Sequence, residues 1–593
     1  MSINLMTKEP NNKVDTTIRN GKTENFLKKM RHWLVSPCTT SFFEQTGEVL
    51  NTSSRYHISD KTIIEKEVND EIILIQQFFI HSSTERCKEI KETLAYNVHN
   101  NCIDKIILLN ERIYSSDELG ISSDKIKQVN IKKRLTYKDV FDYARTVGNN
   151  KYIILSNSDI FFDATIKRIK ISGLTTNKKL FSLLRYEYKP GIPLRDCSLF
   201  GPRPDSQDSW IWHSKWKIPK DISKVLNIEL GKPGCDNKII YLLNILGFAC
   251  FNEPVLIRSY HHHNSIIRNY KNSDRVSQPY HAIFPVLTDE PLANPNQTFD
   301  IIRENKTMMN YLKDKMKDNK PFVIPRIAGV ENEVAMMGAI CTQQKQLNTE
   351  TFNNFEQVIP IMKKNAGIRL DNMEDISFYA TNYLKPFHDS EVFAWWEPWG
   401  NVVKWIPRSF DFIIVNFPKN KIDAFVFDIF HTIHSNPWTL ALKGKRILII
   451  SSFIDSIKEK IPIRKKIYGI DLFPDCEFVF LKPPQTHGKN KSRKLEVEFN
   501  EFVKRIEEIK DSFDVALCSC GGYGNPICGA IYDMGKSAIY VGGVLQMYFG
   551  IYGERWLRER SDIMRMYLNK HWSRPKENER PKNYKEVEKS CYW

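Results

Sequence analysis

The first half of the chain alternates between short apolar runs and longer amphipathic segments. EIILIQQFFI, at residues 71–80, is an almost continuous apolar run, which is typical of a strand buried on both faces. The segment after it carries Cys87, Ile90 and Leu94 at helical spacing. This alternation predicts an α/β domain on a mostly parallel sheet. The predicted elements are strands at residues 71–80, 103–111 and 152–156, and helices at 84–101 and 135–146.

A second α/β pattern follows after a change of composition. Residues 288–325 contain several prolines and a Lys-rich helical piece, so we expect them to connect two domains. These domains are expected at residues 66–287 and 326–593, after a polar N-terminal tail at residues 1–65. In the second domain the pattern predicts strands at residues 410–417, 445–453, 476–481, 513–520 and 537–543, and a helix at 495–509.

Composition narrows the class of protein. The 593 residues carry a net charge of +16, but the lysines are scattered and are not interleaved with aromatic residues, so we expect no nucleic-acid partner. The polar start has no apolar signal region and no run is long enough to span a membrane, which favours a cytoplasmic protein. The twelve cysteines form no CxxC pair, which argues against a structural zinc site. The Lys-, Asn- and Ile-rich composition is consistent with an AT-rich genome, such as that of a large virus.

Four polar motifs follow one another in the first domain. SNSD ends the strand at residues 152–156, and DSQDSW begins at Asp205. GCDN places Asp236 at the start of a predicted helix, where the helix dipole favours a carboxylate. SYHHH ends a short predicted strand with three histidines. Ligands of open parallel sheets bind beyond the carboxyl ends of the strands, so the SNSD step lies where a ligand would be held.

This order of motifs resembles the GT-A family of glycosyltransferases. The resemblance covers roughly residues 70 to 275 and implies a nucleotide-sugar donor and a divalent cation, Mn²⁺ or Mg²⁺. It implies that Asp159 binds the metal and the donor, that His261 or His263 is a further metal ligand, and that Asp236 is the catalytic base. The first Asp of the family's metal motif is Asn157 here. Asn157 is still a candidate donor-binding residue, but Asn ligates a metal more weakly than Asp, which leaves both metal dependence and activity open.

The chemistry of sugar transfer needs these residue types. A departing diphosphate carries negative charge that a hard cation offsets, and an acceptor hydroxyl must lose a proton to a nearby carboxylate. Asp208, in QDSW, is a second candidate for that base. Arg134 lies just before the helix that precedes the SNSD strand, so it is a candidate contact of the diphosphate, although a solvated surface arginine is an equal alternative.

Glycine-rich turns mark the second domain. CGGYGNP, at residues 520–526, and GGVLQ, at residues 542–546, each follow a predicted strand and would let a phosphate approach the backbone; tight packing is the alternative. Together with ERW, HWSRP and the terminal CYW, these motifs resemble an uncharacterised Rossmann-like domain of bacterial and large-DNA-virus glycan-synthesis proteins. The resemblance implies a second transferase or a binding module. The candidate donor-binding residues are Gly522, Gly524, Asn525, Gly543, Gln546, Arg555 and Arg574.

The sequence therefore predicts an α/β protein in which a GT-A-like mixed-sheet domain precedes a Rossmann-like domain. The expected function is metal-assisted transfer of a sugar from a nucleotide sugar to a glycan or another hydroxyl acceptor. Two alternatives stay open: a non-catalytic glycan-binding or scaffold protein, which Asn157 favours, and a sugar nucleotidyltransferase, which also needs strand-end carboxylates and a metal.

Overall fold

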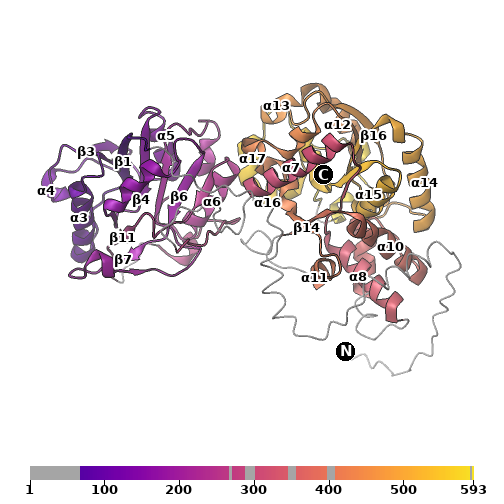
Figure 1. Ribbon diagram of the computed structural model, residues 1–593, viewed down its shortest axis with the longest axis horizontal. Coiled ribbons are helices and arrows are strands. Elements are labelled where there is room, and N and C mark those ends of the chain that lie inside the picture. Colours follow the sequence, from indigo (N-terminus) through magenta and orange to yellow (C-terminus); the bar gives the residue numbers. More distant parts are fainter. Residues whose placement is uncertain are drawn as a thin grey trace.

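The computed structural model describes residues 67–265, 270–287, 301–344, 356–396, 408–581, 583–587 and 590–593. They form two lobes that lie side by side (Figure 1). We call residues 67–287 the N-terminal lobe and residues 301–593 the C-terminal lobe. The expected tail at residues 1–65 lies outside the described residues.

A seven-stranded mixed sheet forms the centre of the N-terminal lobe, in the order β10-β6-β9-β4-β1-β2-β3. β9 runs antiparallel to both of its neighbours, β4 and β6, and the other pairs are parallel. Tyr152–Ser156 of β4 are buried because β4 is central in the sheet. The strands are β1 (Glu71–Gln76), β2 (Lys105–Asn110), β3 (Ile126–Asn130), β4 (Lys151–Ser156), β6 (Lys179–Leu183), β9 (Ser209–His213) and β10 (Ala249–Phe251).

Helices and a second, smaller sheet complete this lobe. Helix α5 begins at Tyr137 because Thr136 and Asp139 form a reciprocal capping box. The small sheet has the order β5-β11-β7-β8 and brings the chain around Asp159 next to the chain around His261. Its strands are β5 (Ile160–Phe162), β7 (Tyr186–Glu187), β8 (Ser198–Leu199) and β11 (Ser259–His261); the helices are α3 (Thr84–His99), α4 (Ser116–Leu119), α5 (Tyr137–Ala144) and α6 (Cys235–Ile245).

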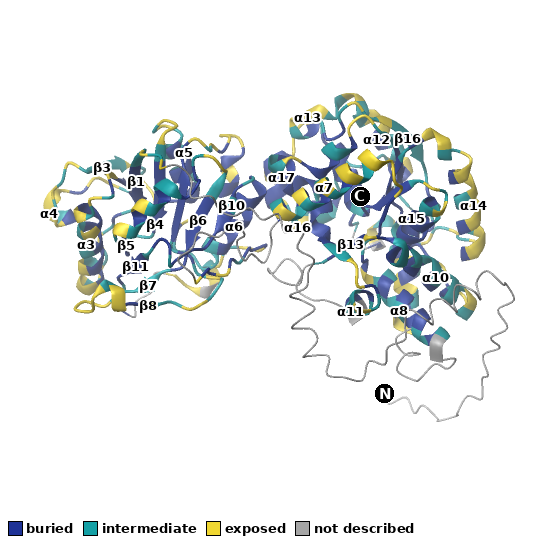
Figure 2. Ribbon diagram, in the orientation of Figure 1, coloured by how far each residue is buried: buried dark blue, intermediate teal, exposed yellow. Residues whose placement is uncertain are grey.

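The C-terminal lobe is built on a five-stranded, all-parallel sheet with the order β12-β18-β17-β15-β16. Figure 2 shows helices around this sheet; the inner strands β15, β17 and β18 are buried, whereas the edge strand β16 is partly exposed. Its strands are β12 (Val323–Ile324), β15 (Arg446–Ser451), β16 (Glu477–Leu481), β17 (Val515–Ser519) and β18 (Ser537–Tyr540), and β13 (Val392–Trp395) pairs with β14 (Asn420–Asp423). Its helices are α7 (Ile301–Asp318), α8 (Gly329–Gln344), α10 (Met373–Asp389), α11 (Arg408–Asn416), α12 (Ile454–Lys460), α13 (Lys465–Tyr468), α14 (Leu495–Glu507), α15 (Gly524–Asp533), α16 (Glu554–Glu559) and α17 (Ser561–Tyr567).

The predicted α/β class is confirmed, with a mixed sheet in the first lobe and a parallel sheet in the second. Two predictions at the level of elements need correction. The segment at residues 410–417, predicted as a strand, is mostly helix α11. Phe410, Ile413 and Phe417 are buried at helical spacing, whereas Val415 is exposed, so the apolar run was a helix with one buried face.

The expected connection between the lobes is shorter than residues 288–325. Helix α7 packs against the C-terminal lobe through Met308 and Leu312, which are fully buried, and β12 is the edge strand of that lobe's sheet. One buried apolar cluster contains side chains of both lobes, so the lobes share packed core. Within the described residues, no helix has the length and apolarity needed to cross a membrane.

Candidate active site

The polar step after β4 forms one wall of a cavity of about 730 Å³. The chain turns after Ser156, where the Ile160 amide donates to the Asn157 carbonyl at 3.2 Å. The turn directs Asp159 inward, and its side chain is nearly buried. The amide of His262 donates to the Asp159 carbonyl at 2.8 Å and ties the turn to β11.

Asp159, His261 and His263 lie together, as predicted for the metal site. The Asp159 Oδ2 atom is 3.3 Å from His261 Nε2 and 3.6 Å from His263 Nδ1. Potential ligand atoms of the three residues all lie within 4.8 Å of one another. The antiparallel pairing of β5 with β11 causes this, because it sets His261 opposite Ile160, the residue after Asp159.

These three side chains fit a divalent cation. The Oδ1 atom of Asp159 is buried and has no hydrogen-bond partner among the described residues, so one carboxylate oxygen is left to a ligand. Imidazole and carboxylate groups are both common ligands of divalent metal ions in proteins.

Two charged residues of α3 reach this group, and the motifs did not identify them. Arg86 contacts Asp159 Oδ2 and pairs with Glu89 at 2.8 Å. Both side chains are buried. A signal was present in the sequence, because Arg86 lies one turn before Ile90 on the apolar side of the predicted helix.

The charges around the group set its titration. Burial alone would raise the pKa of Asp159, but His261, His263 and Arg86 hold it well below the usual range. Burial would lower the pKa of His261, yet the charge of Asp159 and hydrogen bonds with Asp159 and Glu187 raise it to about 9. Without a bound cation, Asp159 and His261 therefore form an ion pair at neutral pH.

Asp208 and Asn157 lie in the middle of the cavity and are hydrogen-bonded to each other. The Asn157 side-chain amide donates to Asp208 Oδ1 at 2.8 Å, and Arg185 Nη1 donates to Asp208 Oδ2 at 2.5 Å. Both carboxylate oxygens of Asp208 thus accept hydrogen bonds within the protein, and its predicted role as the base stays a prediction. Asn157 holds Asp208 in place by a bond that an Asp at position 157 would not make.

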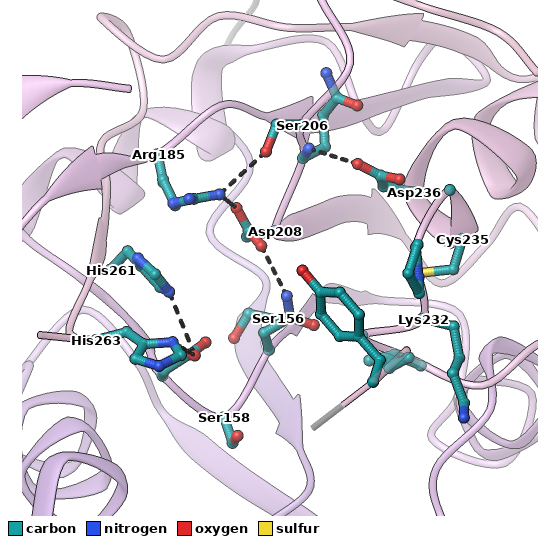
Figure 3. A pocket seen from close by; sticks show the side chains of 18 of the residues that line it. Ser156, Ser158, Arg185, Ser206, Asp208, Lys232, Cys235, Asp236, His261 and His263 are labelled. Atoms are coloured by element: carbon teal, nitrogen blue, oxygen red, sulfur yellow. Dashed lines mark hydrogen bonds and ion pairs between the residues drawn. The ribbon is translucent and has the colours of Figure 1, made fainter. Parts of the chain in front are cut away.

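Asp236 lies across the cavity from His261 and His263, with Arg185 and Asp208 between them (Figure 3). Gly234, in the left-handed region at φ +76°, starts α6, so that Asp236 falls in its first turn. The Gln207 amide donates to Asp236 Oδ2 at 3.2 Å. Burial, with a smaller contribution from the charge of Asp208, raises the pKa of Asp236 to about 7.

Arg134 lines the same cavity, as does Lys232. The guanidinium of Arg134 donates to the Leu230 carbonyl at 2.7 Å, and its Nε lies 3.9 Å from Glu229. Arg134 therefore supports the loop before α6. Its predicted contact with a diphosphate stays a prediction.

The predicted donor-binding residues of the C-terminal lobe are engaged within the lobe. A Cβ at Gly524 would lie 2.1 Å from the Tyr540 ring, and one at Gly543 would lie 2.1 Å from the Tyr592 ring. The space beside these glycines is therefore filled by side chains. The same holds for Gly522, where a Cβ would meet the side chain of Ile368. Asn525 forms hydrogen bonds with the backbone of Arg326, and Gln546 donates to the Tyr592 carbonyl. Arg555 forms an ion pair with Glu559, and Arg574 forms one with Glu554. These contacts are explained by packing within the lobe, and the donor-binding role of the seven residues stays a prediction.

No protein-family model matches the chain, and neither does any curated protein. Solved structures with some similarity include a mannosyltransferase from Pyrobaculum calidifontis in complex with GDP-mannose and Mn²⁺ (8% identity, 50% of this chain and 72% of that chain, TM-score 0.23). A glycosyltransferase with domain of unknown function 1792 from Streptococcus sanguinis has 10% identity over 46% of this chain and 94% of its own, with a TM-score of 0.25. A 4-diphosphocytidyl-2C-methyl-D-erythritol synthase from Anaerococcus prevotii has 14% identity over 35% and 94%, with a TM-score of 0.21. Similarities of this size do not assign an activity to this chain.

Proposed function

We propose that the N-terminal lobe transfers a sugar from a nucleotide-sugar donor to a hydroxyl acceptor. The observation that carries this proposal is the arrangement of one cavity. Three side chains of metal-binding type meet at one end of it, and a carboxyl group with a pKa of about 7 lies across from them. A donor that spans the cavity would place its diphosphate near the first group and its sugar toward the second.

At the diphosphate end, Asp159, His261 and His263 would hold a divalent cation. Such a cation offsets the negative charge of the departing nucleoside diphosphate. Arg134 and Lys232 line the same cavity beside the loop before α6, on the side of Asp236, and add positive charge there that does not depend on a metal.

At the other end, Asp236 acts as the general base. The acceptor oxygen attacks the anomeric carbon, the bond from that carbon to the diphosphate oxygen breaks, and the acceptor proton passes to Asp236. A carboxyl group with a pKa of about 7 accepts this proton more readily than an ordinary aspartate does. Attack opposite to the leaving group inverts the configuration at the anomeric carbon.

Asp236 also favours sugar transfer over nucleotidyl transfer. In nucleotidyl transfer the nucleophile is a phosphate oxygen that is already ionised, so a base with a raised pKa has no task. A glycan-binding protein without activity would need no such base either. An analysis of the products distinguishes the three functions, because each predicts a different product or none.

The first experiment is a thermal-shift panel of nucleotide sugars with and without Mn²⁺ on the intact chain. A donor at about a hundred times its dissociation constant stabilises by roughly 2.7 kcal/mol. We expect one donor to stabilise the protein only with Mn²⁺, and the shift to disappear in His261→Ala. The Asp236→Asn variant should keep the shift, because Asp236 lies away from the three metal-binding side chains.

The second experiment follows the products with the donor that binds. Release of a nucleoside diphosphate in the presence of sugar acceptors, and its loss in Asp236→Asn, supports the proposal. Release of pyrophosphate from a nucleoside triphosphate and a sugar phosphate would instead identify a nucleotidyltransferase. Donor binding with neither product, across a broad acceptor set, would support the glycan-binding alternative.

A further inference from the structure

Helix α6 faces the cavity on one side and the C-terminal lobe on the other. Asp236 is in its first turn, and Lys238 follows two residues later. Successive residues of an α-helix are about 100° apart, so these two side chains point to nearly opposite sides. Lys238 forms an ion pair with Asp562 of α17, and the two residues are only 2% and 6% exposed.

Further contacts continue along the same side of α6. The Tyr241 hydroxyl lies 3.2 Å from His431 Nε2, and both side chains are buried. Just beyond the helix, Gly247 adopts φ +86°, and a Cβ there would come within 2.6 Å of the His434 carbonyl. Only glycine lets the two lobes approach this closely. The C-terminal lobe therefore contacts α6 from its first turn to the turn that follows it.

Apolar packing surrounds these polar contacts. Ile239 and Ile240 of α6 and Ile563 and Met564 of α17 belong to one buried cluster. Lobes that share an apolar core keep a fixed arrangement, whereas lobes with small polar interfaces move relative to each other. Figure 1 shows α6 at the edge of the N-terminal lobe, next to α16 and α17.

We propose that Lys238 and Asp562 are positioning residues for Asp236, so that the C-terminal lobe completes the active site of the N-terminal lobe. This inference rests on the proposed function. A buried ion pair adds little net stability, because both charges lose their water, but its hydrogen bonds allow one geometry only. Here that geometry sets the rotation and height of α6, and with them the place of Asp236 in the cavity.

The test removes both charges together. Lys238→Met with Asp562→Leu leaves no lone buried charge, so the double variant should fold with a melting temperature close to that of the intact protein. The apolar side chains fill the space of the ion pair, but they make no directional hydrogen bond that would fix the orientation of α6 against α17. We expect kcat to fall at least about tenfold, while the dissociation constant of the donor measured with Mn²⁺ changes less than about twofold.

The pH profile gives a second readout that a merely structural role would not change. If the ion pair positions Asp236, the double variant should shift the apparent pKa of the base in kcat/KM away from about 7, the value set by the surroundings of Asp236. An unchanged kcat together with an unchanged pH profile would overturn the inference.

Phe502→Leu is the matched control. Phe502 is buried in α14, on the side of the C-terminal lobe far from the N-terminal lobe (Figure 1). It should lower the melting temperature and leave kcat unchanged; an equal loss of kcat in Phe502→Leu would show that general loosening of the lobe, not the ion pair, matters. If the intact protein neither binds a donor nor turns over, the proposed function itself fails. Normal turnover in the double variant rejects only the positioning role.

Discussion

At the scale of single residues, Asp236 links the chemistry to the stability of the fold. Its folded-state pKa of about 7 lies above the usual 3.8. Between these two values the folded protein holds a proton that the unfolded chain has lost, so stability falls as the pH rises through this window. The lost stability is only about 1–2 kcal/mol, less than the pKa shift alone would give, because Asp236 is not fully buried and solvent screens its charge.

Asp236→Asn should therefore stabilise the protein and inactivate it. We expect the melting temperature to rise by about 1–2 °C at pH 8 and to stay unchanged at pH 4, where the wild-type carboxyl is protonated in the folded state. Turnover should fall by about a hundredfold or more. Calorimetric scans at the two pH values check the first point. Equal shifts at both values would mean that the carboxyl does not titrate near pH 7.

Arg86 is the buried cation nearest to the predicted metal site. Removing it in Arg86→Ala leaves Glu89 and Asp159 without their guanidinium, which we expect to cost about 3 kcal/mol. Mn²⁺ should restore part of the loss, because a cation on Asp159 replaces one of the two missing contacts. Chemical denaturation with and without Mn²⁺ measures both effects.

Arg203→Ala is the control for Arg86. Arg203 pairs with Asp205 at 2.7 Å, but the two side chains are 42% and 51% exposed, so the loss should stay below about 1 kcal/mol and be independent of Mn²⁺. If Arg86→Ala lost as little stability as Arg203→Ala, without an effect of Mn²⁺, the charge of Arg86 would not be needed to stabilise Asp159 and Glu89.

At the scale of elements, the end of β4 explains why the metal motif begins with Asn. The Asn157 amide donates to Asp208, so Asn157→Asp would place two carboxylates in contact instead of completing a metal site. We expect a loss of about 1–3 kcal/mol at pH 8 that becomes smaller at pH 5, and no gain in Mn²⁺ affinity. Tighter Mn²⁺ binding in Asn157→Asp, measured by calorimetric titration, would contradict this role.

Gly524, at the start of α15, is the position at which to test whether glycine is needed for packing or for phosphate binding. A Cβ at Gly524 would overlap the Tyr540 ring, so Gly524→Ala should destabilise the C-terminal lobe by about 1–3 kcal/mol. At Gly329, which begins α8, a Cβ meets no atom within 4 Å, and Gly329→Ala should be neutral or stabilise by about 0.4–1 kcal/mol. Thermal unfolding of the two variants decides this; a folded Gly524→Ala that loses only donor binding would favour the phosphate-binding alternative.

These elements also show what the sequence could predict. Strands such as β4 were recognisable because a strand buried on both faces is a continuous apolar run. Asp159 and His261 were singled out by the resemblance of their motifs to the GT-A family; Asp159 follows β4 and His261 ends β11. Helix α11 was misassigned, since a short apolar run fits a strand and a one-sided helix equally well. The position of Arg86 on the apolar side of α3 was a signal that it is buried, but its partner Asp159 is 73 residues away and no local pattern records that pair.

At the scale of the whole molecule, the arrangement of the two lobes was outside the reach of sequence patterns. Lys238 looks like any lysine of an amphipathic helix until Asp562, 324 residues later, is placed against it. The same holds for Gly247, whose need for glycine comes from the His434 backbone of the other lobe. The two lobes, which the sequence patterns predict as separate domains, are thus packed against each other in the structure.

The chain should accordingly not tolerate separation of its lobes. A protein ending at residue 287 exposes the apolar side of α6 and leaves Lys238 without Asp562, so its melting temperature should lie roughly 10 °C or more below that of the intact chain, or the lobe should aggregate. Scanning calorimetry and light scattering on both proteins measure this. An isolated N-terminal lobe as stable as the intact chain would mean that the contacts at α6 join two independent domains and do not complete one site.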